Sequence, residues 1–227
     1  FRRLIELGIA LSAERDHDRL QEMILLEAKR ICNADGGTLY ILTEDEQGLE
    51  FAIMRNDTLN IAKGGTTGIE IPFPPLSLIR DDGAPNYSNV ATAVALTKTT
   101  VNIPDAYEET STFDFSGTMA FDKQTNYRSM SFLTVPLTTR QDSLIGVLQL
   151  INARDAQNVV TPFSPDIQPI IEALSSQAAV AIENEMLLRS QRELLDSFIE
   201  LMAGSIDAKS AYTGGHCQRV PLVTELL

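Results

Sequence analysis

The sequence lacks tryptophan and contains only two cysteines and two histidines in 227 residues. Cys32 and Cys217 lie too far apart for a CxxC motif or a zinc-ligand spacing, so neither is predicted. No run approaches the roughly 18 apolar residues of a membrane-spanning helix, and no secretory signal is recognisable. We therefore expect a cytoplasmic protein with reduced cysteines and no membrane insertion. Because the chain opens on Phe1 rather than methionine, we interpret it as part of a longer protein.

Basic residues are also scarce. The chain has 18 Lys and Arg against 31 Asp and Glu, which gives a formal net charge of −13. A nucleic-acid surface requires clustered Lys and Arg that displace counterions from phosphates, and the sequence contains no such stripe. Nucleic acid is therefore not an expected partner.

Apolar residues make up 44% of the chain, enough for a hydrophobic core, and their spacing predicts its elements. Residues 1–34 are predicted to be helical in two segments, the second capped by Asp16 or Asp18. A short helix capped by Ser88 is expected within 86–97, whereas the polar segment 106–126 has no predicted element. Strands or extended segments are predicted at 38–42, 49–54, 68–73, 99–103, 129–137 and 144–152. This order predicts an α+β fold with one antiparallel sheet and helices packed on a single face.

A long helix is predicted near the C-terminus. Ser164-Pro165-Asp166 is a favourable helix start, and apolar residues recur every seven positions from Ile167 to Met202. No proline interrupts residues 170–204, so a helix of about 40 residues, ~60 Å long, is predicted. A strict coiled coil has a second apolar position in each heptad. Here the residues at this second position are mixed: Ile170, Gln177, Asn184, Gln191 and Phe198. We expect the first half to pack on its own domain and the second half to form a dimeric connector; a simple connection onward is the alternative.

Four segments carry a family resemblance: ADGGTLYIL, TTVNIPDAYE, FDKQTNYRSMSFLTVPL and LIGVLQLINA. In this order and spacing they resemble a GAF domain over residues 16–186, most closely the branch of cyclic-nucleotide phosphodiesterases and adenylyl cyclases. The resemblance implies a six-stranded antiparallel sheet with a small-molecule pocket roofed by variable loops and short helices. It also implies a regulatory sensor and a homodimer rather than a catalyst.

The cyclic-nucleotide branch carries an Asn, Lys, Phe, Asp and Glu signature after the last strands. Asn152, Phe163 and Asp166 match this signature. Ala153 stands where the family has Lys, and Ile167 stands where it has Glu. The ion pair that fixes the pocket architecture in those relatives therefore cannot form here.

Ligand chemistry indicates candidate pocket residues. The phosphate of a cyclic nucleotide needs amide donors or a helix N-terminus, and its base needs an apolar or aromatic slot. The candidate ligand-binding residues are Ser88, Asn89, Phe113, Phe115, Thr118, Asp122, Thr125 and Tyr127. Loop Thr and Asp residues usually cap turns and aromatic residues usually fill cores, so a GAF domain without a ligand is the alternative.

A second resemblance begins near residue 194. LLDSFIELMAGSIDAKSAYTGGHCQRVPLVTELL resembles the opening of an HD or HD-GYP metal-dependent phosphohydrolase domain, whose Tyr-Thr-x-x-His-x-x-Arg-Val setting is matched by Tyr212, Thr213, His216, Arg219 and Val220. The resemblance implies that His216 lies near a divalent metal, Fe or Mn, in the full-length parent, with further ligands after residue 227. His17-Asp18 lies on the wrong side of His216 for the family's His-Asp pair and is interpreted as a helix start. No cofactor is expected in this chain alone.

The two resemblances divide the chain into a linker helix (1–15), a GAF sensor domain (16–186), a connector helix (187–206) and the start of a phosphohydrolase domain (207–227). The favoured function is ligand sensing and dimerisation in a metal-dependent phosphohydrolase, such as a cyclic di-GMP phosphodiesterase. The alternative is a structural dimerisation domain without a ligand. A third hypothesis, redox catalysis within the GAF fold, is disfavoured because Cys32 lies on the first helix, outside the pocket region.

Overall fold

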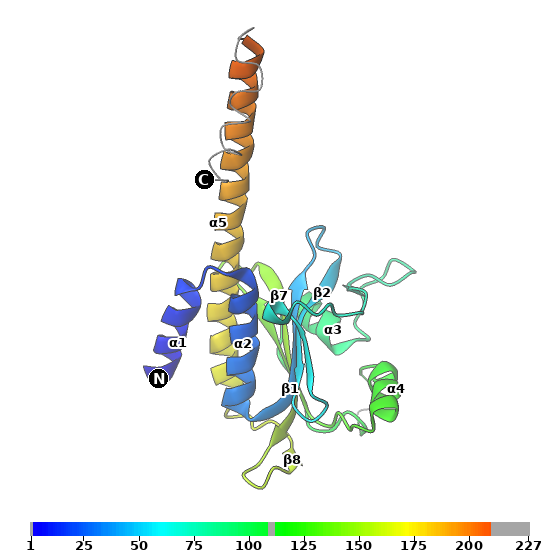
Figure 1. Cartoon of the computed structure of the whole chain (residues 1–227). Coiled ribbons are helices and arrows are strands. Elements are labelled where there is room, and N and C mark those ends of the chain that lie inside the picture. The colour runs from blue at the N-terminus through cyan, green and yellow to red at the C-terminus, as the bar shows by residue number, and fades with distance from the viewer. Residues whose placement is uncertain (1, 109–111, 210–227) are drawn as a thin grey trace. The chain divides into compact units, whose positions relative to one another are not determined.

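A computed structural model describes residues 2–108 and 112–209 of the chain (Figure 1). Its helices are α1 (Arg2–Ala13), α2 (His17–Cys32), η1 (Gly65–Thr67, a 3-10 helix), α3 (Val90–Thr97), α4 (Ser116–Thr125) and α5 (Gln168–Lys209). Its strands are β1 (Ala34–Leu42), β2 (Gly48–Asn56), β3 (Ile61–Gly64), β4 (Leu76–Ser77), β5 (Val101–Ile103), β6 (Phe132–Thr138), β7 (Leu144–Arg154) and β8 (Val160–Thr161). His216, Cys217 and the remaining phosphohydrolase motif residues lie outside the described ranges.

All described strands belong to one antiparallel sheet. Six strands lie in the order β3-β2-β1-β7-β6-β5, β4 pairs with β2, and β8 pairs with β7. The predicted α+β class, with an N-terminal helix and a long C-terminal helix, is confirmed. The main path has the six strands that the family resemblance implied, and five of them match predicted segments, whereas β3 was not predicted. Strands β4 and β8 add two residues each.

The sheet has one face that packs against the long helices, called here the helical face. Leu39, Leu148 and Val135 lie in one row on this face, because β1 and β6 both pair with β7. Residues of α2 and of α5 up to Ile182 bury their apolar side chains in the same cluster. Figure 1 shows α2 and the first part of α5 on this side of the sheet.

The opposite face is called the cavity face. Tyr40, Val147 and Phe132 lie on it, and α3 packs against them. We expected helices on one face only; the long helices do share one, and α3 and α4 form a second, shorter layer (Figure 1). Successive side chains of a strand point to opposite faces, and the central strands carry apolar residues on both. The second face therefore also needs a covering layer.

The loop predictions need three corrections. The predicted strand at 68–73 is absent from the structure, and β3, η1 and β4 flank that segment instead. Prolines at 72, 74 and 75 provide no ladder donors there. Asn89, rather than Ser88, caps α3, since its carboxamide oxygen accepts hydrogen bonds from Ala91 and Thr92 N–H groups. Helix α4 lies within residues 106–126, for which no helix or strand was predicted. Only Asp122 of this helix is buried, so the helix shows no periodic apolar pattern in the sequence.

Helix α2 begins where the sequence predicted. The carboxylate of Asp16 accepts a hydrogen bond from Arg19 N–H at 2.9 Å, which satisfies one of the free amides of the first turn. Asn33, in the left-handed conformation, ends the helix. The pair His17-Asp18 therefore lies in the first turn of α2, as a helix-start interpretation requires.

The two departures from the cyclic-nucleotide signature lie in the core. Ala153 is buried in the cluster on the helical face, and Ile167 packs against the same cluster. Apolar packing in place of a buried ion pair is often neutral or stabilising, because two charges need not be desolvated. The missing Lys and Glu therefore leave no unpaired charge in this part of the fold.

The chain divides into two compact units, residues 1–183 and residues 184–227, and the boundary falls within α5. Within the first unit α5 contributes buried residues up to Ile182. In the second unit its large apolar side chains are exposed: Met186, Leu187, Leu188, Leu194, Leu195, Phe198, Ile199, Leu201 and Met202. Such a density of exposed apolar residues is unusual for a monomeric surface.

The contact between β1 and β7 leaves no room for a side chain at Gly146. A Cβ atom added there would lie 2.1 Å from the carbonyl oxygen of Tyr40, a backbone atom of the paired strand. We predict that Gly146→Ala lowers the free energy of unfolding by about 1–3 kcal/mol, because the central pair must separate. Urea unfolding followed by circular dichroism measures this. Gly117→Ala is the matched control, since nothing lies within 4 Å of its added Cβ. Equal urea midpoints for Gly146→Ala and the wild type would contradict the register.

Candidate functional site

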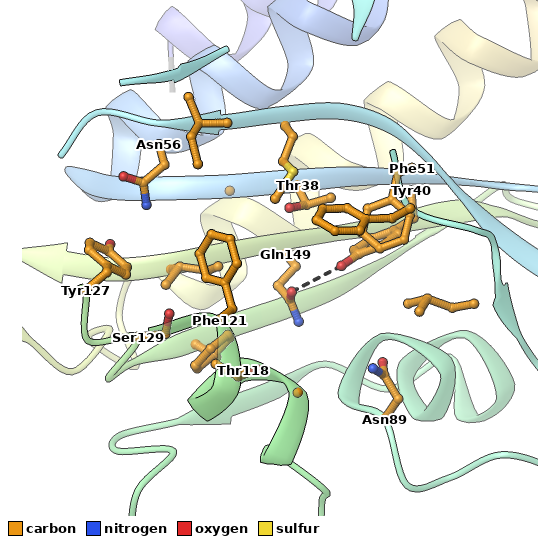
Figure 2. A pocket seen from close by; sticks show the side chains of 18 of the residues that line it. Thr38, Tyr40, Phe51, Asn56, Asn89, Thr118, Phe121, Tyr127, Ser129 and Gln149 are labelled. Atoms are coloured by element: carbon orange, nitrogen blue, oxygen red, sulfur yellow. Dashed lines mark hydrogen bonds between the residues drawn. The ribbon is translucent and has the colours of Figure 1, made fainter. Parts of the chain in front are cut away.

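A cavity of about 580 Å³ lies on the cavity face of the sheet (Figure 2). Strands β1, β2, β6 and β7 form its floor, and α4, the start of α3 and the loops beside them form the remaining walls. Its volume is within the usual range for small-molecule sites, roughly 300–1,000 Å³. The residues that line it are Gly37, Thr38, Tyr40, Phe51, Met54, Arg55, Asn56, Leu59, Ile61, Phe73, Leu76, Asn86, Ser88, Asn89, Asp114, Ser116, Gly117, Thr118, Phe121, Tyr127, Ser129, Phe132, Gln149 and Ile151.

A row of polar side chains, called here the polar row, lies on the cavity face of the sheet and consists of Thr38, Gln149 and Thr134. Thr38 and Gln149 line the cavity, and Thr134 lies beside it. The sheet register pairs Gln149 with Thr38 on one side and with Thr134 on the other. Directly paired residues of antiparallel strands share a face, so all three belong to the cavity face. Thr38 and Thr134 are buried and Gln149 is half-buried. Polar groups in such a place need hydrogen-bond partners.

The carboxamide of Gln149 is held by both neighbouring strands. Its Nε2 donates to Thr134 Oγ1 at 3.2 Å, and its Oε1 accepts a longer hydrogen bond, 3.4 Å, from the Tyr40 hydroxyl. Figure 2 shows the carboxamide of Gln149 with its hydrogen bond to Tyr40, beside the aromatic rings. A carboxamide can accept two hydrogen bonds and donate two. The contacts with Thr134 and Tyr40 use one N–H and one oxygen lone pair. The second N–H and the second lone pair remain for a ligand.

Aromatic rings form one wall of the cavity. The centroids of Tyr40 and Phe51 lie 4.8 Å apart, and those of Phe51 and Phe73 lie 5.4 Å apart. Phe121 reaches toward the floor from α4 (Figure 2). Burial raises the pKa of the Tyr40 hydroxyl, which keeps this group neutral at physiological pH. Tilted aromatic pairs of this kind provide faces on which a flat ring can stack.

Tyr127 lies at the opposite end of the cavity within a buried hydrogen-bond network. Its hydroxyl donates to Asp35 and accepts a 2.9 Å hydrogen bond from Asn152 Nδ2. Burial raises the pKa of this hydroxyl, and the hydrogen bond to Asp35 raises it further. Asp35 also pairs with Arg154 at 2.6 Å. The network fixes the tyrosine ring, because each strong partner of its hydroxyl is itself buried or paired.

Asn152 connects β7 to the segment before β6. It adopts the left-handed conformation, with φ of 56°, and is almost fully buried. Its Oδ1 accepts from the N–H groups of Met130 and Ser131, at 2.7 and 3.2 Å. Its Nδ2 donates to Arg128 C=O at 2.7 Å in addition to Tyr127. This signature residue therefore positions the cavity rim rather than the cavity floor.

The cavity carries little net charge. Arg55 is the only Lys or Arg among the described lining residues, and its guanidinium pairs with Glu22 of α2 at 2.6 Å. The same guanidinium donates to Lys63 C=O at 2.5 Å. Burial acts to raise the pKa of Glu22, but hydrogen bonds from Arg55 and Thr66 lower it overall, so the carboxylate stays charged. Arg55 is thus neutralised on the helix side of the sheet.

The two short helices present their N-termini to the cavity differently. At α3, the Asn89 side chain already occupies the amides of Ala91 and Thr92. At α4, the N-cap residue is Phe115, whose side chain makes no capping hydrogen bond. The carboxylate of Asp114, however, accepts a hydrogen bond from Ser116 N–H at 2.8 Å. The first intrahelical hydrogen bond runs from Met119 N–H to Phe115 C=O, which leaves the amides of Gly117 and Thr118 without a partner inside the helix. Helix α4 is therefore the better source of amide donors.

The candidate residues from the sequence divide into two groups. Ser88, Asn89, Thr118 and Tyr127 line the cavity, whereas Phe113, Phe115, Asp122 and Thr125 do not. Phe115 is buried and Phe113 packs against the core of the cavity face. Thr125 bonds the carbonyl of Phe121 in its own helix.

Asp122 has a structural environment. It accepts hydrogen bonds from the Tyr107 hydroxyl at 2.8 Å and from the backbone and side chain of Ser129 at 2.7 and 2.8 Å. These contacts attach α4 to the chain before β6. Ligand contact by any candidate residue stays a prediction.

Sequence reasoning missed the polar row. Thr38 and Gln149 stand inside the apolar segments ADGGTLYIL and LIGVLQLINA. Alternation alone places Gln149 on the same face as Val147 and Ile151, which is the signal that could have identified it. The partnership of Gln149 with Thr134 depends on strand register, which a single sequence does not provide.

Cysteine and metal chemistry can be assessed for the described residues. Burial raises the pKa of the Cys32 thiol to about 12, so it remains protonated and unreactive. Within residues 2–108 and 112–209, no group of three or more His, Cys, Asp or Glu side chains could hold a metal ion. No described helix combines the length and hydropathy needed to span a membrane.

Comparisons with known proteins agree with this architecture. The dual 3′,5′-cyclic-AMP and -GMP phosphodiesterase 11A of Takifugu rubripes is 31% identical over 97 residues, which are 43% of this chain and 10% of that protein. The chain thus matches about a tenth of the length of this curated relative.

Solved structures show the same fold. The GAF domain of the Acinetobacter phosphoenolpyruvate-protein phosphotransferase is similar with a TM-score of 0.58 and 15% identity, over 82% of this chain and 94% of that one. The free methionine-R-sulfoxide reductase of Neisseria meningitidis gives a TM-score of 0.56 at 12% identity, over 82% and 89%. The sequence profile described as "GAF domain" matches residues 16–182, and the chain therefore belongs to the GAF domain family.

Proposed function

We propose that this chain is a regulatory GAF domain that binds a small molecule of the cyclic-nucleotide class. The observation that carries the proposal is the cavity of about 580 Å³ with polar groups on its floor and aromatic rings in its wall. A binding site combines an apolar enclosure with a few convergent polar groups. This cavity has both.

The charge of the cavity favours a ligand with few negative charges. A nucleoside triphosphate would need several cations, but the one basic residue among the described lining residues is paired with Glu22. A cyclic monophosphate carries one negative charge, which the amides of Gly117 and Thr118 in the first turn of α4 can hold without a basic side chain. The carboxylate of Asp114 accepts the Ser116 amide at this helix start and repels any phosphate there, the more strongly the more negative charge the phosphate carries.

The similarity to a phosphodiesterase of cyclic AMP and cyclic GMP supports the same ligand class. That support concerns 97 residues of a much longer protein. The absence of the signature Lys and Glu does not argue against it, because Ala153 and Ile167 pack in the core on the opposite face of the sheet.

The alternative, a purely structural domain, requires a cavity filled by the chain's own side chains. Phe121 and Phe73 border the cavity without closing its volume. Apolar side chains that filled this volume would also leave the remaining donor and acceptor of the Gln149 carboxamide without partners, which is unfavourable.

We further propose that residues 184–209 of α5 mediate dimerisation. Leu188, Leu195 and Met202 are spaced by seven residues and are about half exposed or more. Leu187, Leu194 and Leu201 repeat the same spacing one position earlier, which widens the apolar stripe. A second copy of the same helix is the partner that fits a heptad stripe.

The C-terminal resemblance extends the proposal to a parent enzyme. We propose that the GAF domain regulates an HD-type phosphohydrolase that uses Fe or Mn and acts on a cyclic di-nucleotide such as cyclic di-GMP. His216 would be one metal ligand in that protein. Coupling between a ligand site and a catalytic domain is typically worth about 1–3 kcal/mol.

Ligand binding is tested by thermal shift with cyclic AMP and cyclic GMP. At about 100 times its dissociation constant, a ligand stabilises the folded state by ~2.7 kcal/mol, which raises the melting temperature by about 5–10 °C. Phe121→Ala should weaken binding about tenfold or more, because a stacking surface is lost. Tyr87→Ala is the control, since Tyr87 is half-exposed and outside the cavity lining. No shift with either nucleotide would refute this ligand class.

Dimerisation is tested by analytical ultracentrifugation. The double variant Leu188→Asp/Leu195→Asp should be monomeric at micromolar concentration, because it places two charges in the proposed helix interface. The control Val159→Asp places a charge at a similarly exposed apolar residue on the β7–β8 turn. It should leave the dimer unchanged. A wild-type monomer, or a dimeric double variant, would contradict the proposed interface.

The enzymatic proposal is tested with the full-length parent protein loaded with Fe²⁺ or Mn²⁺. We expect it to hydrolyse cyclic di-GMP at a rate that changes several-fold with the GAF ligand, since coupling of about 1–3 kcal/mol corresponds to about 5–150-fold. His216→Ala should lower both bound metal and activity. Full activity in His216→Ala would contradict a ligand role for this residue.

A further inference from the structure

The polar row points to a specific function for one residue in ligand selection. We propose that Gln149 is the specificity-determining residue of the cavity, and that its carboxamide binds the hydrogen-bonding edge of a flat nitrogen heterocycle. This inference rests on the proposed small-molecule function and adds the chemistry by which the ligand is distinguished.

Gln149 occupies a position where packing alone would favour an apolar residue. Its neighbours on the same strand and face, Val147 and Ile151, belong to or pack against the apolar core of the cavity face. Gln149 instead lies at the centre of the floor, between β1 and β6. Burying a carboxamide in such a place is unfavourable unless its groups are hydrogen-bonded.

The partners of Gln149 leave a defined recognition edge. Nε2 donates one hydrogen to Thr134, and Oε1 accepts one bond from Tyr40. One N–H and one oxygen lone pair remain, in the plane of the same carboxamide. An adjacent donor and acceptor match the edge of a heterocycle such as adenine, in which an amino group lies beside a ring nitrogen.

The surroundings favour a flat ring beside that edge. Tyr40 and Phe51 form the adjacent wall, and Phe121 approaches from α4 (Figure 2). A ring stacked against these side chains has its edge, rather than its face, available to the floor. Thr134 does not line the cavity. Its hydroxyl accepts a hydrogen bond from Gln149 Nε2 and so positions the carboxamide from behind.

The inference is tested with the 3′,5′-cyclic monophosphates of adenosine and inosine, which share phosphate and ribose but exchange donor and acceptor on the ring edge. Isothermal titration of the wild-type domain should give dissociation constants that differ about tenfold or more, as a bidentate carboxamide contact provides. Gln149→Leu should reduce this ratio to within about twofold. Thr134→Val, which removes the positioning acceptor, should give an intermediate ratio.

Gln157→Leu is the matched control, because Gln157 is exposed on the turn after β7 and outside the cavity lining. It should keep the wild-type ratio. Binding of both nucleotides with the same ratio in the wild type and in Gln149→Leu would overturn the assignment of Gln149 while leaving the ligand class intact. Binding of neither nucleotide by the wild type would overturn the proposed function and this inference together. Melting curves of each variant establish that it is folded.

Discussion

The antiparallel pairing of β1 with β7 is the constraint on which the rest of the structure depends. It places Leu39 opposite Leu148 on the helical face and Thr38 opposite Gln149 on the cavity face. A slip of one residue would turn every side chain of one strand to the wrong face. The close approach of Gly146 to β1 helps to fix this register, since any side chain there would meet the backbone of the paired strand.

The same strands therefore serve two surfaces. Their apolar residues on the helical face anchor α2 and the first part of α5, whereas their residues on the cavity face form the floor of the site. A ligand that changed the floor would act on strands that also hold the start of α5. The strands thus connect the proposed ligand site physically to the start of α5. The free energy that a ligand can transmit this way is limited to the difference between its affinities for two conformations of the domain.

The sequence predicted those elements whose apolar pattern is regular. The central strands, both long helices and the Asp16 cap all follow from local patterns. Helix α4 was missed because its side chains are mostly exposed, and β3 was missed among glycines that adopt positive φ. Four of eight candidate residues line the cavity, because they lie in loops or helix starts that any pocket on this face would use. Strand alternation could have placed Gln149 on the cavity face, but its hydrogen-bond partners could not be predicted locally, since they lie on strands distant in sequence.

A crystal structure of the domain bound to cyclic AMP tests the central claim most directly, namely that the polar row builds a ligand site on the cavity face. We predict that the ring lies beside Phe121 and the wall of Tyr40 and Phe51, with its edge toward the floor and about 2.7–3.2 Å from the carboxamide of Gln149. A ligand bound elsewhere, or a cavity closed by the side chains of Phe73 and Phe121 with Gln149 bonded only within the protein, would contradict it.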